Sequence, residues 1–137
     1  MDWNRERMED FSIEKKIYYH DTDCGGVVYY ANYLKYLEEA RTEYLLTKGI
    51  ELPKLAEKNV WFVVARVEID YKTPAHYQEK LKVSARVEEI KLSTLRFFQE
   101  IRREGITVVK ATTTLVCVGN DFKPIRVPEE IRNAILN

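Results

Sequence analysis

One long helical pattern followed by several alternating runs is the feature that most constrains the fold of this chain. Between residues 30 and 48, apolar side chains recur at the i, i+3, i+4, i+7 spacing that places them on one face of an α-helix. These side chains are Tyr30, Tyr33, Leu34, Leu37, Ala40, Tyr44 and Leu45. Lys48 and Gly49 then mark the helix end, because a cation favours the last turn and glycine tolerates a left-handed backbone. The pattern predicts a single helix of about five turns.

After Pro53 the period of the apolar residues changes from the helical spacing to two, which is typical of strands with one buried face. The strands predicted on this basis are Val63–Lys72, Leu81–Glu88, Leu95–Arg102 and Ile106–Val118. Glu104-Gly105 is a tight-turn pair, so the last two strands should form an antiparallel hairpin.

The two ends of the chain add shorter elements. Ser12–Tyr19 predicts a first strand after a loose segment that extends to about Glu9, and Pro128 followed by two glutamates predicts a short terminal helix. The order is then one strand, the long helix and four strands in a meander. This order predicts an α+β fold in which a long central helix is wrapped by a five-stranded antiparallel sheet.

Length and charge limit the function further. The 137 residues contain no linker and no repeat, which predicts a single domain over residues 1–137. Lysine plus arginine and aspartate plus glutamate each total 22, so charge favours neither a nucleic-acid nor an anionic-membrane partner. No apolar run approaches the roughly 20 residues that span a bilayer, so no membrane insertion is expected.

The two cysteines, Cys24 and Cys117, form no CxxC pair and lie beside no histidine cluster. This spacing argues against a zinc site and fits a reducing compartment. The charged start of the chain also lacks an apolar signal core. We therefore predict a cytoplasmic location.

The segment with unusual chemistry is HDTDCGG, residues 20–26, directly ahead of the predicted helix. Glycines allow a ligand to approach the backbone, and the free N–H groups at a helix N-terminus can donate to an oxygen that gains negative charge. A carboxylate facing such donors predicts a hydrolase site, with a base or nucleophile on one side and an oxyanion stabiliser on the other.

Two alternatives for this segment remain open from the residues alone. Asp21 and Asp23 could serve only as turn and capping residues, which is a common use of Asp-x-Asp before a helix. They could also bind Mg²⁺, although the sequence places no third acidic group to complete such a site.

The stretch YYHDTDCGGVVYYANYLKYLEEARTEYL resembles the signature of the 4-hydroxybenzoyl-CoA thioesterase family, and most resembles its Tol–Pal-associated bacterial acyl-CoA thioesterases. The resemblance extends from about Ser12 to Pro128 and includes VARVEIDYKTPA and KPIRVP. It implies the hotdog fold and an enzyme that hydrolyses an acyl-CoA thioester to the free acid and CoA.

The resemblance also implies roles for residues of this loop. Asp23 corresponds to the catalytic carboxylate, acting as a general base or as a nucleophile, whereas Asp21 shapes the loop. The backbone N–H of Tyr30 polarises the thioester carbonyl, and Gly26 and Val27 line the acyl channel.

Further positions follow from the same resemblance. Tyr29 and Asn32 are substrate-binding candidates, Asn32 also bracing the loop, and Lys91 and Lys123 are candidates for the coenzyme A phosphates. Apart from the resemblance, Arg41 lies between apolar positions of the predicted helix, so it is predicted to be structural and to tie the helix to the sheet through a carboxylate. The resemblance implies no metal and no cofactor. Coenzyme A is part of the substrate and is not counted as a cofactor.

An exposed edge strand is a hazard that proteins usually cover. The resemblance implies that two hotdog sheets pair edge to edge, so a homodimer or homotetramer is expected, with each active site between protomers. A hotdog dehydratase is a rival function that needs a catalytic histidine, but only His20 and His76 are present and neither is in the helix pattern. A non-catalytic acyl-CoA sensor is the second rival.

Overall fold

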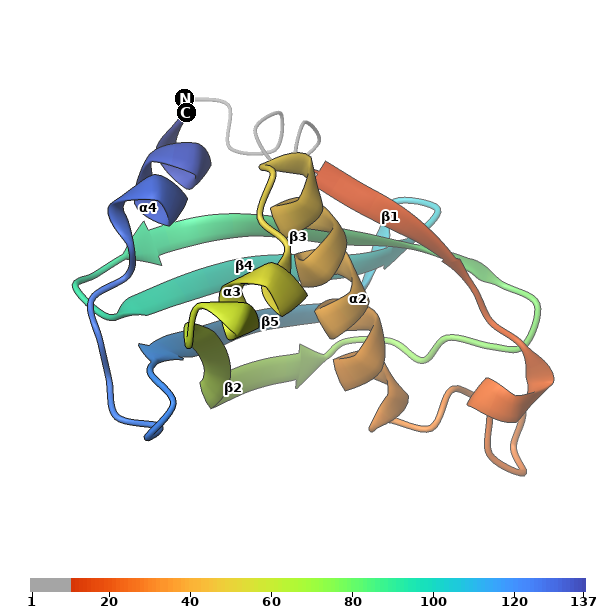
Figure 1. The fold of residues 1–137 in the computed structure, drawn as a ribbon. Coiled ribbons are helices and arrows are strands. Elements are labelled where there is room, and N and C mark those ends of the chain that lie inside the picture. Colours follow the sequence, from red (N-terminus) through yellow and green to blue (C-terminus); the bar gives the residue numbers. More distant parts are fainter. Residues whose placement is uncertain (1–10) are drawn as a thin grey trace.

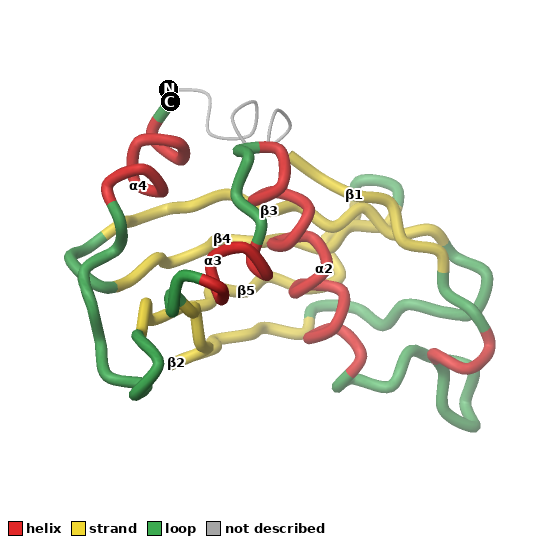
Figure 2. The backbone as a smooth tube through the Cα atoms, in the orientation of Figure 1, coloured by secondary structure: helices red, strands yellow, loops and turns green. Residues whose placement is uncertain are grey.

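A computed structural model describes residues 11–137, so the predicted loose segment up to Glu9 lies outside the described residues. In chain order the elements are β1 (Phe11–Lys16), the 3₁₀ helix η1 (Tyr19–Asp21), α2 (Asn32–Thr47), α3 (Leu52–Glu57), β2 (Trp61–Tyr71), β3 (Lys80–Ile90), β4 (Thr94–Arg103), β5 (Ile106–Val118) and α4 (Glu129–Leu136). The helix α2 lies across one face of the sheet (Figure 1), and α4 lies near one end of it (Figure 2).

The five strands form one antiparallel sheet in the order β1-β3-β4-β5-β2. The predicted meander of four strands is therefore only partly correct. β3, β4 and β5 do follow one another, but β2 pairs with β5 rather than with β3. The free edge of β3 is taken by β1, as in the pair Ile13–Val83, so the chain crosses the sheet between β2 and β3.

The hairpin between β4 and β5 forms as predicted. Glu104 and Gly105 have φ values of 48° and 80°, and both therefore occupy the left-handed region that a tight two-residue turn requires. The turn sets the register between β4 and β5. The predicted first strand is shorter than expected, because the chain leaves β1 at Lys16 and turns into η1.

α2 forms within two residues of its predicted bounds, but its buried face is rotated from the predicted one. Tyr30 and Leu34 are exposed, Tyr30 at 61%, whereas Tyr36 and Arg41 are buried. Tyr30 lies before the first helical residue, Asn32, so the helical spacing does not apply to it. The remaining apolar face packs on fully buried side chains of β3 and β4, which are Leu81, Val83, Ala85, Leu95, Phe97 and Ile101.

β2 differs from the half-buried strand that its alternation predicts. Its alternating apolar residues Val63, Val67 and Tyr71 would form the buried face, but they are exposed, and Val64 is 54% exposed. β2 is an edge strand that neither α2 nor another strand covers on its outer side. The sequence analysis also missed α3, a short helix with a proline in its first turn.

Candidate active site

The loop between β1 and α2 is tied together by Asp21, which is only 4% exposed. Its Oδ2 accepts a hydrogen bond from the Tyr18 N–H at 2.9 Å. Its carbonyl oxygen accepts bonds from the Tyr29 N–H at 3.0 Å and from the Asn32 side-chain amide at 2.9 Å. Asp21 therefore holds the start of the loop against its end, and Asn32 braces the loop from the first residue of the helix.

Asp23 lies in a small turn of the same loop and is exposed. Its N–H donates to the Val27 carbonyl at 3.0 Å, and its own carbonyl accepts from the Gly26 N–H at 3.1 Å. One carboxylate oxygen, Oδ1, accepts from the Gly25 N–H at 2.9 Å, whereas Oδ2 bonds to no described residue. Gly26 has φ = 78°, which favours glycine at this position of the turn. The turn thus holds a carboxylate with one oxygen free.

The chain enters α2 without a side-chain cap. The carbonyls of Tyr29 and Tyr30 accept the N–H groups of Asn32 and Tyr33, but the N–H groups of Tyr30 and Ala31 bond to none of the described residues. Unpaired donors at a helix start can stabilise an oxygen that gains negative charge. The N–H of Tyr30 is therefore free to donate a hydrogen bond, as its predicted role of polarising the thioester carbonyl requires.

The connection between β2 and β3, residues 72–79, supports the loop from outside. The Val28 N–H donates to the Ala75 carbonyl at 2.8 Å, and the Tyr77 N–H donates to the Gly26 carbonyl at 3.2 Å. Val27 forms an isolated bridge with His76. Gly26 and Val27, both predicted to line the acyl channel, are thus bound by backbone contacts to this connection.

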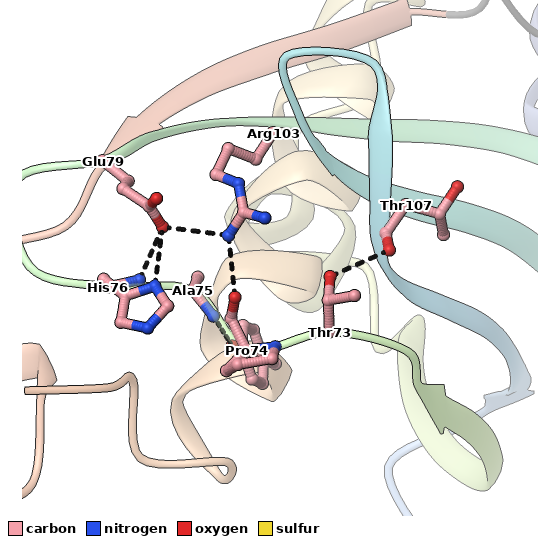
Figure 3. Close-up of polar contacts among 8 residues, drawn as sticks. Thr73, Pro74, Ala75, His76, Glu79, Arg103 and Thr107 are labelled. Atoms are coloured by element: carbon pink, nitrogen blue, oxygen red, sulfur yellow. Dashed lines mark hydrogen bonds and ion pairs between the residues drawn. The ribbon is translucent and has the colours of Figure 1, made fainter. Parts of the chain in front are cut away.

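Arg103 of β4 fastens the connection to the sheet (Figure 3). Its guanidinium donates to the Pro74 carbonyl at 2.8 Å and to Oε1 of Glu79 at 3.2 Å, and the same oxygen accepts the His76 N–H at 2.7 Å. Burial raises the pKa of Glu79, but the bonds from His76 and Arg103 outweigh it and the pKa lies below its ordinary value. The network therefore favours an ionised Glu79.

A cavity of about 280 Å³ lies beside the start of α2. Its lining residues are Val28, Tyr30, Tyr33, Tyr71, Lys72, Thr73 and Pro74. The ring of Tyr71 lies 6.0 Å from that of Tyr30 and 5.8 Å from that of Tyr33, measured between centroids. From the sequence, Tyr71 is predicted only as part of a strand. No local pattern distinguishes it, because its place in the cavity depends on which strand lies beside the helix.

The structure does not bring Lys91 and Lys123 together with Asp23 in one chain. Residues 72–79, which contact the Asp23 loop, precede β3, whereas Lys91 follows the last residue of β3. An 11-residue strand separates them by roughly 30 Å. Lys123 lies in the loop after β5, at the same end of the sheet as α4 (Figure 1).

Arg41 has a different partner from the predicted one. It is 9% exposed, and its guanidinium donates to the side-chain carbonyl of Gln99 at 3.1 Å. Gln99 in turn donates to the carbonyls of Leu37 and Ser84. Arg41 does tie the helix to the sheet, but the expected carboxylate is wrong and a neutral amide takes its place.

No group of three His, Cys, Asp or Glu side chains in residues 11–137 is arranged to hold a metal ion. Cys24 is exposed and Cys117 is buried, and both are free thiols. None of the described helices is long and apolar enough to cross a membrane.

Comparison with known proteins gives consistent matches. The model of the thioesterase-like superfamily matches residues 18–135. Acyl-CoA thioesterase YbgC of Haemophilus influenzae is 40% identical over 126 residues, covering 90% of this chain and 93% of the relative. Acyl-CoA thioester hydrolase YbgC of Escherichia coli is 34% identical over 118 residues, covering 85% and 88%.

Among solved structures, a thioesterase of Thermus thermophilus complexed with coenzyme A and zinc is similar to this chain with a TM-score of 0.82. The two sequences are 32% identical, and the match covers 93% of this chain and 94% of that one.

Proposed function

This chain belongs to the thioesterase-like superfamily, and on that premise we propose that it is an acyl-CoA thioesterase. The hotdog fold expected from the sequence is confirmed. Water adds to the thioester carbonyl, the carbon–sulfur bond breaks, and the products are the free acid and the CoA thiol. The observation that carries the proposal is the pairing, in one loop, of a free carboxylate oxygen on Asp23 with the unpaired N–H of Tyr30.

In the proposed mechanism the N–H groups of Tyr30 and Ala31 donate to the carbonyl oxygen as it becomes an oxyanion. Asp23 either removes a proton from the attacking water or attacks the carbonyl itself to form a mixed anhydride that water then cleaves. In both routes the proton ends on the thiolate that leaves. The free Oδ2 supports either role, because the turn already holds Oδ1.

The acyl group is proposed to enter the cavity beside Tyr30. Gly26, Val27 and Tyr29 do not line this cavity, whose lining begins at Val28. They are proposed to lie at its entry, and Asn32 would hold the loop through its bond to Asp21. No metal or cofactor takes part in this proposal. We also propose that residues 1–137 act as a single domain in the cytoplasm.

A homodimer paired through β2 is proposed to complete the site. Antiparallel pairing of two β2 strands places the start of one strand beside the end of the other, so the partner's Trp61 would lie near Tyr71. Trp61 pairs with Val118, five residues before Lys123. The partner's Lys123 would therefore approach the Tyr30 cavity, where it could bind a coenzyme A phosphate, and the partner's Lys91 lies at the same end. Two such dimers would form the expected tetramer.

Thiol release from a series of acyl-CoA thioesters tests the function. We expect hydrolysis by the wild type and a loss of about 100- to 10,000-fold in kcat for Asp23→Asn, with the fold retained. Glu43→Gln is the control, because Glu43 is an exposed carboxylate of α2 that lines neither the loop nor the cavity, and this variant should keep the wild-type turnover. Near-normal turnover by Asp23→Asn, or no hydrolysis of any acyl-CoA by the wild type, would contradict the proposal.

A further inference from the structure

A second cavity lies next to the one beside Tyr30 and shares its two walls. It measures about 280 Å³ and is lined by Leu34, Lys35, Glu38, Arg41, Val64, Val67 and Thr113. The first cavity uses the start of α2 and the end of β2, and the second uses the next turns of α2 and the middle of β2. The two cavities share no lining residue, but their linings follow one another along both α2 and β2. We infer from this order that they form one groove, which leads away from the proposed catalytic loop.

The end of this groove farthest from Tyr30 contains buried polar groups with few hydrogen-bond partners. Arg41 is 9% exposed, and its one hydrogen bond to a described residue goes to the neutral amide of Gln99. Thr113 is 1% exposed, and its hydroxyl is buried without a hydrogen-bond partner in the described part of the chain. Both residues line the cavity.

The acidic residue nearest to Arg41 does not neutralise it by contact. Glu38 precedes Arg41 by one helical turn and attracts its charge, but no described carboxylate lies within ion-pair distance of the guanidinium. Glu38 and Lys35 are both exposed at the mouth of the cavity. A buried guanidinium offers five donors in a planar fork, and a carboxylate is the group that best matches this geometry.

We propose that Arg41 and Thr113 bind a carboxylate at the far end of the acyl group, so that the preferred substrates are CoA thioesters of dicarboxylic acids. This inference rests on the proposed thioesterase function. Arg41 lies nine residues after Asn32, the first residue of α2, which is about 14 Å along the helix axis, and side chains of a helix lean toward its start. The matching acyl group is therefore of medium length.

An acyl chain that ends in a methyl group fits this end of the groove less well. It would remove water from the guanidinium and from the Thr113 hydroxyl without supplying an acceptor to either, which is unfavourable for buried polar groups. Arg41 would then be the residue that separates carboxylate-ended from methyl-ended acyl groups of equal length.

Binding to the Asp23→Asn variant tests the proposal without requiring turnover. Calorimetry would compare octanoyl-CoA with suberoyl-CoA and decanoyl-CoA with sebacoyl-CoA, each pair equal in chain length and different only at the far end. We expect the dicarboxylic thioester of at least one pair to bind about tenfold more tightly, the gain of a hydrogen-bonded charge pair.

Arg41→Met in the same background should abolish this preference, and Thr113→Val should weaken it. Arg41→Met leaves the buried side-chain oxygen of Gln99 without its donor, which lowers stability, so thermal unfolding checks that each variant is folded. Lys82→Met, at an exposed lysine of β3 that lines neither cavity, is the control for a general effect of positive charge and should retain the preference.

The possible failures are distinguishable. If no acyl-CoA binds, the proposed function itself is wrong. If both members of every pair bind equally well, or if Arg41→Met leaves the preference unchanged, the dicarboxylate site is wrong while the thioesterase function stands. Equal binding to the Asp23→Asn variant that becomes a preference after an added Glu38→Gln substitution would show that Glu38 neutralises Arg41, which also overturns the proposal.

Discussion

Asp21 and Asp23 are two residues apart in one loop, but their surroundings separate their roles. The Asp21 carboxylate is buried and accepts the Tyr18 N–H, whereas the Asp23 carboxylate is exposed and keeps one oxygen free. Burial, followed by the negative charge of Asp21, raises the pKa of Tyr36, so this tyrosine stays neutral beside the carboxylate. At the scale of residues, one aspartate holds the loop and the other is available for chemistry.

Alanine at these two positions should therefore have opposite effects. Asp21→Ala leaves the Tyr18 N–H without an acceptor and should lower the free energy of unfolding by about 1–3 kcal/mol. Asp23→Ala removes only an exposed turn contact and should cost less than about 1 kcal/mol, although it should abolish hydrolysis. Urea unfolding followed by circular dichroism measures both, and equal destabilisation by the two variants would contradict the assignment.

The connection of residues 72–79 is the element on which the active-site loop depends. It contacts the loop through backbone bonds at Gly26 and Val28 and is itself held to β4 by Arg103 and Glu79. The Ala75 N–H donates to the Tyr33 hydroxyl at 3.2 Å, which joins the connection to α2 as well. Loop, helix and sheet therefore meet at this one segment (Figure 3).

The lowered pKa of Glu79 makes part of the stability pH-dependent. Because the folded state favours the ionised carboxyl, the stabilisation is present above the ordinary pKa of 4.5 and is lost as the pH falls through the lower folded-state value. Glu79→Gln should thus be less stable than the wild type near neutral pH, and the difference should shrink below pH 4.5.

Thermal unfolding of both proteins from neutral to acid pH measures this difference. Glu43→Gln, a substitution at an exposed glutamate of α2, is the control and should show no comparable trend. A stability difference for Glu79→Gln that stayed constant over the whole range would show that the ionised form of Glu79 is not favoured in the folded protein.

At the scale of the whole molecule, the edge strand β2 and the separated site residues point to the same assembly. β2 exposes Val63, Val64 and Val67 along an unpaired edge, which is the kind of surface that proteins usually cover. The catalytic loop and the two candidate phosphate-binding lysines lie at opposite ends of one protomer. A two-fold symmetric dimer paired through β2 would cover this edge and would also bring the lysines of one protomer near the Asp23 loop of the other.

A charge on this edge should break the pair. Val63→Asp, at an exposed residue of β2 that lines neither cavity, should shift the protein toward a monomer of 16.2 kDa and reduce thioester hydrolysis in parallel. Leu136→Asp places the same charge on another exposed apolar residue, in α4, and should leave assembly unchanged. Sedimentation velocity at micromolar concentration decides the matter, and a wild-type monomer with full activity would contradict the shared site.

Metal dependence is a second property of the whole enzyme. The Asp21 carboxylate is buried and already accepts a backbone bond, so it is poorly placed to share a cation with Asp23. Thiol release should therefore be unchanged after exhaustive chelation. Activity that disappears with the chelator and returns with one divalent ion would instead identify the loop as a metal site.

The sequence by itself determined what depends on neighbours along the chain. The helical spacing between residues 30 and 48 placed α2 within two residues of its bounds, and alternation placed β3, β4 and β5. The left-handed preference of Glu104-Gly105 determined the hairpin. The resemblance of residues 18–45 also directed attention to the loop that proves to hold a free carboxylate oxygen and unpaired helix donors.

Only the tertiary structure decided which segments meet. Alternation in β2 fixes a face but not a neighbour, so neither its pairing with β5 nor its exposure on the edge could be read from the residues. For the same reason the position of Tyr71 beside Tyr30 could not be predicted from the sequence. The predicted partner of Arg41 was a carboxylate, whereas the structure has Gln99. The separation of Lys91 from Asp23 was not predicted either. Each of these contacts joins residues distant in the chain, and strand order, which no local pattern encodes, brings them together or keeps them apart.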